Sequence, residues 1–197
     1  MPRPDVSEAR KAQILAAALQ VFSETSYERV SMRQIIAQSG LSAGGVYWYF
    51  KSKEEILAAL LLQIAKENFA RIDAILGAPL LAIRKLEQVI TLMIEQSKNL
   101  SHLYLNQAKY HAMLSAEPAT HAIMEQIGAG YQARLRAIIE QGIAEGEFQP
   151  LEAESVAQAF LGIYEGLMLL WVISPQALDL RKNLLTAAQI LLAGLKK

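Results

Sequence analysis

Apolar residues recur at helical spacing along almost the whole chain, and no segment alternates steadily between apolar and polar positions as a half-buried strand would. The apolar positions of the first predicted helix follow the i, i+3, i+4, i+7 rule: Leu15, Ala18, Leu19 and Phe22. Asp5 and Glu8 have the spacing of a capping box at its start, and we expect it to stop near Thr25 and Ser26. The pattern predicts an all-α fold of about nine helices.

Two serines mark the starts of the next two helices. Ser31 fits an N-cap position, with Gln34 three residues later to complete a capping box. Gly40 is expected to end this short helix, because glycine readily adopts the left-handed conformation that closes a helix. Ser42 caps a third helix only two residues later. A very short turn therefore joins the second helix to the third.

The remaining chain divides into longer helices. Ser52 and Glu55 repeat the capping box at the start of a fourth helix, whose apolar face continues towards Ile75. Beyond Pro79, prolines, glycines and Asn99 punctuate the apolar pattern. Five further helices are expected at about residues 80–99, 101–115, 118–145, 151–173 and 177–195.

Two short helices joined through Gly40 match a helix-turn-helix, in which the first helix braces and the second lies in the major groove of DNA. Small and then aromatic residues make up the second helix: Ala43, Gly44, Gly45, Tyr47, Trp48 and Tyr49. The small residues let the backbone approach a groove closely, and the hydroxyls and the indole N–H can reach phosphates. The alternative for an isolated run of this kind is that it packs a corner between helices.

Composition and charge agree with this interpretation. The chain has 197 residues, of which 53% are hydrophobic, enough for a substantial core. It has no cysteine, which excludes disulfides, thiolate zinc sites and a cysteine nucleophile. Net charge is zero overall, but residues 1–53 carry seven Lys/Arg against four acids, whereas residues 54–197 carry twelve against fifteen. The N-terminal part is therefore the part that favours phosphate.

Other functional classes find little support. The N-terminus has no apolar region of a signal peptide, and the most apolar stretch, residues 156–173, contains Gln158 and Glu165. We therefore expect a cytoplasmic protein without a membrane partner. No Gly-rich phosphate loop, nucleophile elbow or HExxH motif is present, so no enzyme apparatus is visible. The spacing of His102, His111 and His121 does not favour a metal site, and no cofactor is expected.

Residues 30–57 read VSMRQIIAQSGLSAGGVYWYFKSKEEIL. This string resembles, nearly position for position, the DNA-binding signature of the TetR family of transcriptional regulators, and the later helices and total length also agree with that family. The resemblance implies a three-helix helix-turn-helix DNA-binding domain over residues 1–52. It also implies a helical bundle for effector binding and dimerisation over residues 53–197.

The resemblance assigns DNA contacts to ten positions: Ser31, Arg33, Ser42, Ala43, Gly44, Gly45, Tyr47, Trp48, Tyr49 and Lys53. Ser31, Tyr47 and Lys53 would hold phosphates. Few direct base contacts are expected, because alanine and glycine offer no side-chain hydrogen bonds, so specificity would depend on Arg33, Trp48 and DNA shape. Ser26 stands where the family usually has glycine, so a non-glycine residue is expected to adopt positive φ there.

The region between residues 60 and 170 is rich in aromatic, methionine and sparse polar side chains, which suit a ligand pocket or an ordinary core equally well. Because family members bind small molecules inside this bundle, the resemblance implies an effector site at these residues: Phe69, Ile90, Met93, Ile94, Tyr104, Gln107, Tyr110, His111, Met124, Tyr131, Leu135 and Trp171. The core remains the alternative for each of them.

The last two long helices carry apolar residues on more than one face. In the family these helices form the dimer interface, and the resemblance implies that the following residues supply it: Ala157, Phe160, Leu161, Tyr164, Met168, Leu184, Ala188, Leu191 and Leu192. The alternative is a core within one chain. A homodimer is expected because two recognition helices one DNA turn apart read a palindromic site.

These features predict a repressor that binds a palindromic operator as a dimer and is released by a small, largely apolar effector. The effector would shift the fourth helix and so change the separation of the two recognition helices. Two alternatives stay open. One is a helical DNA-binding regulator controlled by a protein partner without a ligand, and the other is an all-α enzyme acting on a hydrophobic substrate.

Overall fold

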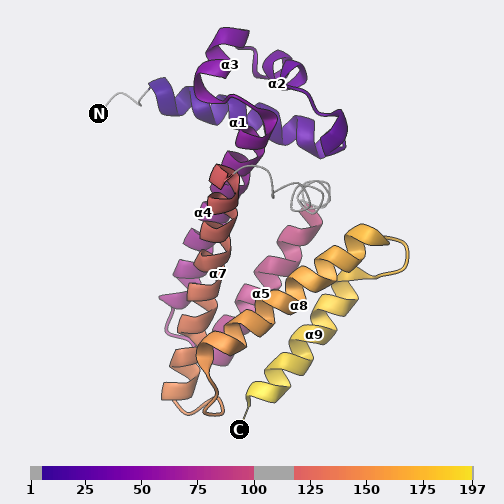
Figure 1. The fold of residues 1–197 in the computed structure, drawn as a ribbon. Helices are drawn as coiled ribbons and strands as arrows, with labels where there is room; N and C mark the ends of the chain where they lie inside the picture. Colours follow the sequence, from indigo (N-terminus) through magenta and orange to yellow (C-terminus); the bar gives the residue numbers. More distant parts are fainter. Residues whose placement is uncertain (1–5, 100–117, 197) are drawn as a thin grey trace. The chain divides into compact units, whose positions relative to one another are not determined.

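The computed structural model describes residues 6–99 and 118–196. Within these ranges the chain forms eight α-helices, one 3-10 helix and no strand, as predicted for an all-α fold (Figure 1). The elements are α1 (Val6–Glu24), η1 (Tyr27–Arg29), α2 (Met32–Ser39), α3 (Ala43–Tyr49), α4 (Lys53–Leu76), α5 (Ala82–Asn99), α7 (Pro118–Ala144), α8 (Ala153–Ile173) and α9 (Leu180–Leu195). The predicted helix at 101–115 and the capping residue Asp5 lie outside the described residues.

The helices divide between two compact units. Residues 6–65 and 118–125 belong to one unit, and residues 66–99 and 126–196 belong to the other. The units divide within α4, after Ala65. The functional division into residues 1–52 and 53–197 stays a prediction. Both α4 and α7 contribute residues to each unit.

The first unit is built on α1, which packs against α2, and α2 in turn contacts α3 (Figure 1). Its fully buried side chains come from all three helices and include Phe22, Ile35 and Val46. The capping box at Ser31 is present as predicted, and Gly40 ends α2 in the left-handed conformation with φ 67°. These two local signals determine the length of α2 and the tight turn into α3.

The turn after α1 differs from the prediction. Ser26 has φ −63° and ψ 144°, so it lies in the extended region and does not adopt positive φ. In the described residues only Gly40 and Gly146 have positive φ. The chain avoids the strained conformation because Ser26 leads into the single 3-10 turn of η1, which begins with the buried residue Tyr27.

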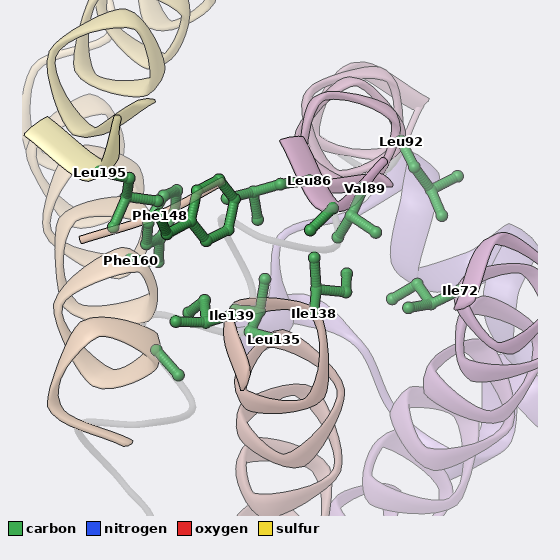
Figure 2. Close-up of a cluster of buried hydrophobic side chains, with 12 residues drawn as sticks. Ile72, Leu86, Val89, Leu92, Leu135, Ile138, Ile139, Phe148, Phe160 and Leu195 are labelled. Carbon is green, nitrogen blue, oxygen red and sulfur yellow. The ribbon is translucent and has the colours of Figure 1, made fainter. Parts of the chain in front are cut away.

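The core of the second unit gathers apolar side chains from α4, α5, α7, α8 and α9. Figure 2 shows Leu86 and Val89 of α5 facing the α7 residues Leu135, Ile138 and Ile139, with Leu92 on the side of Ile72 and with Phe148, Phe160 and Leu195 near Leu86. In this unit α9 contacts both α5 and α8. Close packing is visible at Gly142, where an added Cβ would lie 2.2 Å from the ring of Phe148.

The loop between α7 and α8 joins the ends of several helices in the second unit. The Glu147 carboxylate accepts hydrogen bonds from the backbone N–H groups of Ala82 (2.8 Å) and Ile83 (3.1 Å) and so caps the start of α5. The Gln149 N–H donates to the carbonyl of Leu195 at the end of α9 (2.9 Å). These bonds satisfy helix-end groups that would otherwise lack partners.

Candidate nucleic-acid interface

The exposed surface of α2 and α3 carries most of the predicted DNA contacts. Ser31, Arg33, Ser42, Ala43 and Gly44 are exposed. In contrast Val46 and Phe50 are buried and anchor α3 to its unit. The helix therefore turns one face to the core and leaves the other available to a partner.

Two aromatic side chains dominate this open face. Trp48 is 79% exposed and Tyr47 is 42% exposed, which is unusual for large apolar groups in a small domain. Tyr49 is half-buried. At the start of the same helix, an added Cβ on Gly44 would meet no atom within 4 Å. On this face the backbone is therefore uncovered at Gly44, and the aromatic side chains of Tyr47 and Trp48 follow with their hydrogen-bond donors.

Serine side chains cap the N-termini of α2 and α3. The Ser31 hydroxyl accepts from the Gln34 N–H (3.4 Å) and donates to Gln34 Oε1 (2.9 Å), while the Ser31 N–H donates to the same oxygen (2.8 Å). The Ser42 hydroxyl accepts from the Gly45 N–H (3.1 Å). Both side chains are first of all caps, and their helix N-termini bring a positive dipole end to the exposed surface.

Lys53 does not lie on this open surface. It is half-buried, and its Nζ donates to the backbone carbonyls of Tyr27 (2.9 Å) and Val30 (3.0 Å). Lys51, two residues earlier, is exposed, and its Nζ donates to the carbonyl of Tyr47 (2.6 Å) on α3. The sequence assigned no site role to Lys51, although it belongs to the same Lys-Ser-Lys string.

Half of the capping box predicted at the start of α4 is present, and its second hydrogen bond goes to the residue before Ser52. The Ser52 hydroxyl accepts from the Glu55 N–H (3.2 Å), as expected. The Glu55 carboxylate reaches one residue further back and accepts from the Lys51 N–H (2.6 Å). Lys51 is thereby held by its backbone at the α4 end and by its side chain at the α3 end.

Four of the predicted effector residues share one apolar cavity of about 40 Å³ in the second unit. They are Ile90, Met93, Ile94 and Leu135. The other lining residues come from α8 and α9: Phe160, Ile163, Tyr164, Leu184, Ala187, Ala188 and Leu191. A space with such apolar walls favours an apolar group over a charged one.

Phe69 and Tyr131, also predicted for the effector site, contact each other edge to face with ring centroids 4.9 Å apart. The Tyr131 hydroxyl accepts a hydrogen bond from the amide of buried Asn68 (3.0 Å), and the amides of Asn68 and Gln96 bond to each other. Burial of Tyr131 raises the pKa of its phenol. Asn68, Gln96 and Tyr131 thus form a neutral polar cluster inside an apolar unit.

The remaining predicted effector residues are scattered. Trp171 is half-buried on α8, and Met124 belongs to the other compact unit. The other four lie outside the described residues: Tyr104, Gln107, Tyr110 and His111.

The residues predicted for the dimer interface lie inside the second unit. Six of them are buried within the chain: Ala157, Phe160, Tyr164, Met168, Leu184 and Ala188. Leu161, Leu191 and Leu192 pack against the same core. In the single chain these side chains therefore pack α8 and α9 against the rest of the unit, and their part in a dimer interface stays a prediction.

A different face of the same two helices is exposed and apolar. Its large residues are Ile163, Leu169, Leu170 and Ile173 on α8, and Leu185 and Ile190 on α9. Ile173 and Ile190 are 70% and 67% exposed. Exposed apolar groups on helices that contact each other make this face a candidate interaction surface.

Neither a metal centre nor a membrane span appears in the ranges 6–99 and 118–196. Within them, no group of three or more His, Asp or Glu side chains could hold a metal ion. No helix there is long and apolar enough to cross a membrane. His121 pairs with Glu125 one turn later on α7 (3.1 Å), and His102 and His111 lie outside the described residues.

Comparison with known proteins agrees with this architecture. Residues 14–60 match the family described as bacterial regulatory proteins, tetR family, and residues 83–195 match the C-terminal region of BetI-type transcriptional repressors. The first match covers the helix-turn-helix. The second covers most of the unit that contains the cavity and the exposed face of α8 and α9.

Individual relatives span nearly the whole chain. The fatty acid metabolism regulator protein of Bacillus subtilis is 26% identical and covers 93% of this chain and 94% of its own length. The crystal structure of FadR from Bacillus subtilis in complex with stearoyl-CoA is 25% identical, with a TM-score of 0.78 over 93% of this chain and 98% of that one. A TetR regulator from Haloarcula marismortui has the same fold, with 19% identity and a TM-score of 0.85 over 96% and 100% of the two chains.

These matches set the enzyme alternative aside, because the family consists of transcriptional regulators and the similar curated proteins are named as regulators. The exposed face of α2 and α3 corresponds to the part of the chain that carries the family's DNA-binding signature. The chain belongs to the tetR family of bacterial regulatory proteins and is a DNA-binding transcriptional repressor.

Proposed function

We propose that this repressor binds a palindromic operator as a homodimer and that a small, largely apolar effector releases it. The observation that carries the DNA-binding part is the exposed face of α3, where Gly44 leaves the backbone open and Trp48 and Tyr47 project from the surface. α3 would lie in the major groove, held by phosphate contacts from α2, from Tyr47 and from nearby cations, with few direct base contacts. Because its partner would be chromosomal DNA, we place the protein in the cytoplasm.

The effector proposal rests on the apolar cavity and the neutral cluster beside it. The cavity residue Leu135 lies one turn after Tyr131 on α7, and the cavity residue Ile94 lies two residues before Gln96 on α5. An effector with an apolar body and a neutral polar group would use both features. FadR of Bacillus subtilis, solved with stearoyl-CoA, suggests a fatty acyl compound as the first candidate to test.

A cavity of about 40 Å³ holds only a small apolar group, so a larger effector must move the helices that line it. α4 contributes residues to both compact units, and we propose that it carries this movement towards the DNA-binding helices. Effector and DNA would then prefer different conformations, and their coupling would be reciprocal. Control by a protein partner remains the second candidate.

We further propose that the homodimer forms through α8 and α9 and that a second copy covers the exposed apolar face of these helices. The nine residues first expected there pack within or against the core of the single chain, and the proposed interface would extend from them to that face. The exposed face is apolar enough to be covered by a second copy of itself, as a twofold interface requires.

Two measurements test the proposed function: selection of a DNA sequence by the protein, and release of that DNA by an apolar compound. The protein is used to select duplexes from a random-sequence library, and the enriched duplex is labelled for fluorescence anisotropy. A palindromic enriched sequence is expected, together with weaker binding when stearoyl-CoA or another apolar compound is added. Failure to enrich any sequence would overturn operator binding. Binding that no apolar compound changes would favour the protein-partner alternative.

A further inference from the structure

Lys53, the first residue of α4, is enclosed by the turn that connects α1 to α2. Its Nζ lies 2.9 Å from the carbonyl oxygen of Tyr27 and 3.0 Å from that of Val30. The same ammonium lies 4.3 Å from the centroid of the Tyr27 ring, a cation–π distance. Two of its three N–H donors are therefore committed to backbone carbonyls, and its remaining side faces an aromatic ring.

Tyr27, which contacts Lys53 through its carbonyl and its ring, is held in position by further contacts. Tyr27 is 1% exposed and stacks on Phe22 of α1. Its hydroxyl donates to the Glu54 carboxylate (2.6 Å), so consecutive residues of α4 hold Tyr27 from two sides. Val30, the other carbonyl partner, directly precedes Ser31, the N-cap of α2. Lys53 and Glu54 thus tie the first turn of α4 to the segment that leads into the brace helix.

We infer that Lys53 is a positioning residue for the helix-turn-helix: it contributes to operator binding by fixing the start of α2 relative to α4, and not by neutralising a phosphate. This inference rests on the proposed function, because it takes α2 and α3 to be the DNA-binding surface. Turning the ammonium towards DNA would break two charge-assisted hydrogen bonds, and the Tyr27 carbonyl would keep only the N–H of Val30 (3.3 Å) as a donor.

An exposed cation close by can supply the phosphate contact instead. Lys51 lies on the surface, and its Nζ is held at the carbonyl of Tyr47, a residue proposed to face the DNA backbone. Because Lys51 and Lys53 are two residues apart and carry the same charge, they form a matched pair that differs in burial and hydrogen bonding.

The salt dependence of binding separates the two roles. The logarithm of the association constant falls linearly with the logarithm of salt concentration, and each phosphate contact contributes about 0.9 to the slope. Wild type, Lys53→Met and Lys51→Met are compared by anisotropy across a range of NaCl concentrations on the duplex selected by the wild-type protein. Active concentration is fixed by stoichiometric titration, so that loss of folded protein is not counted as loss of affinity.

Lys53→Met is expected to weaken binding about tenfold with an unchanged slope, because it loses hydrogen bonds that orient the helices. Lys51→Met is expected to lower the slope by about 0.9. A lower slope in Lys53→Met, or wild-type affinity in that variant, would overturn the inference while leaving operator binding intact. Absence of any duplex enriched by the wild type would instead overturn the proposed function.

A conservative variant keeps the inference testable if Lys53→Met does not fold. Lys53→Arg retains the positive charge but replaces the compact ammonium with a planar guanidinium that fits the two carbonyls and the ring differently. A positioning role predicts weaker binding with the wild-type slope. A double variant, Lys53→Gln with Lys51→Arg, removes the charge at position 53 and keeps the charge at position 51. If it has a lower slope, and if Lys53→Arg binds with wild-type affinity, then Lys53 is a phosphate contact and the inference is wrong.

Discussion

The hydroxyl of Tyr27 donates a 2.6 Å hydrogen bond to the carboxylate of Glu54 and so joins the turn after α1 to the first turn of α4. Burial of this carboxyl acts to raise its pKa, but hydrogen bonds from Tyr27, the backbone and Ser52, together with the charge of Lys53, outweigh it. The pKa of Glu54 is therefore lowered. A lowered pKa in the folded state stabilises the protein above the ordinary carboxyl range and loses this effect as pH falls through the folded value.

Tyr27→Phe should reduce stability in a pH-dependent way. The variant keeps the ring over Lys53 but removes the donor to Glu54, so the melting temperature should drop most near pH 7. The difference from wild type should shrink as the pH falls below the ordinary carboxyl range and through the lowered pKa of Glu54. Thermal unfolding followed by circular dichroism from pH 3 to pH 7 measures this. Tyr47→Phe, which alters an exposed tyrosine, is the control, and a pH-independent difference would contradict the prediction.

Gly44→Ala should separate folding from DNA binding. An added methyl group meets nothing within 4 Å, and alanine is the better helix former by up to ~1 kcal/mol, so stability should not fall. If the backbone of α3 lies against the groove, the methyl group should weaken operator binding about tenfold. Denaturant unfolding and anisotropy measure the two effects. Gly128→Ala on α7, also in open space, should leave DNA binding unchanged.

Gly142→Ala should destabilise the second unit although alanine favours a helix. An added Cβ would lie 2.2 Å from the buried ring of Phe148, so the ring must move, at a cost of about 1–3 kcal/mol. Gly128→Ala, on the same helix but in open space, should be neutral or stabilising. Urea unfolding of both variants checks the difference. Equal stabilities would mean that Phe148 adapts freely.

Ile190→Glu should convert the proposed dimer to a monomer. Ile190 is two-thirds exposed in the single chain, so the carboxylate costs little in the monomer but would be buried without a partner in an α8–α9 interface. Sedimentation velocity measures the oligomeric state. Leu81→Glu, at an exposed position before α5, should remain dimeric. A dimeric Ile190→Glu variant would place the interface elsewhere.

Ala187→Val should block the effector without affecting the operator. Ala187 lines the cavity, and two extra methyl groups would occupy much of its roughly 40 Å³. Operator affinity should stay at the wild-type level, while the apolar compound that releases the wild type should lose its effect. Anisotropy with and without that compound checks this. Normal release of the variant would show that the effector binds at another place.

Local signals in the sequence determined much of the DNA-binding unit. The Ser31–Gln34 capping box, the end of α2 at Gly40 and the cap at Ser42 involve partners three residues apart or a single backbone conformation, so neighbouring residues suffice to predict them. Helical periodicity similarly placed α5, α7, α8 and α9 within about three residues of their observed ends. The exposed position of Trp48 agrees with the family resemblance, which assigned it to the DNA-contacting residues.

Only the tertiary structure decided which of two lysines is enclosed and which apolar face is covered. The partners of Lys53 lie 23 and 26 residues away, so nothing in the Lys-Ser-Lys string distinguishes it from the exposed Lys51. On α8 the apolar residues surround the helix, so periodicity could not tell that Phe160 faces the core while Ile173 faces outwards. Local hydrogen bonds depend on neighbouring residues, whereas burial depends on which surfaces the fold brings together.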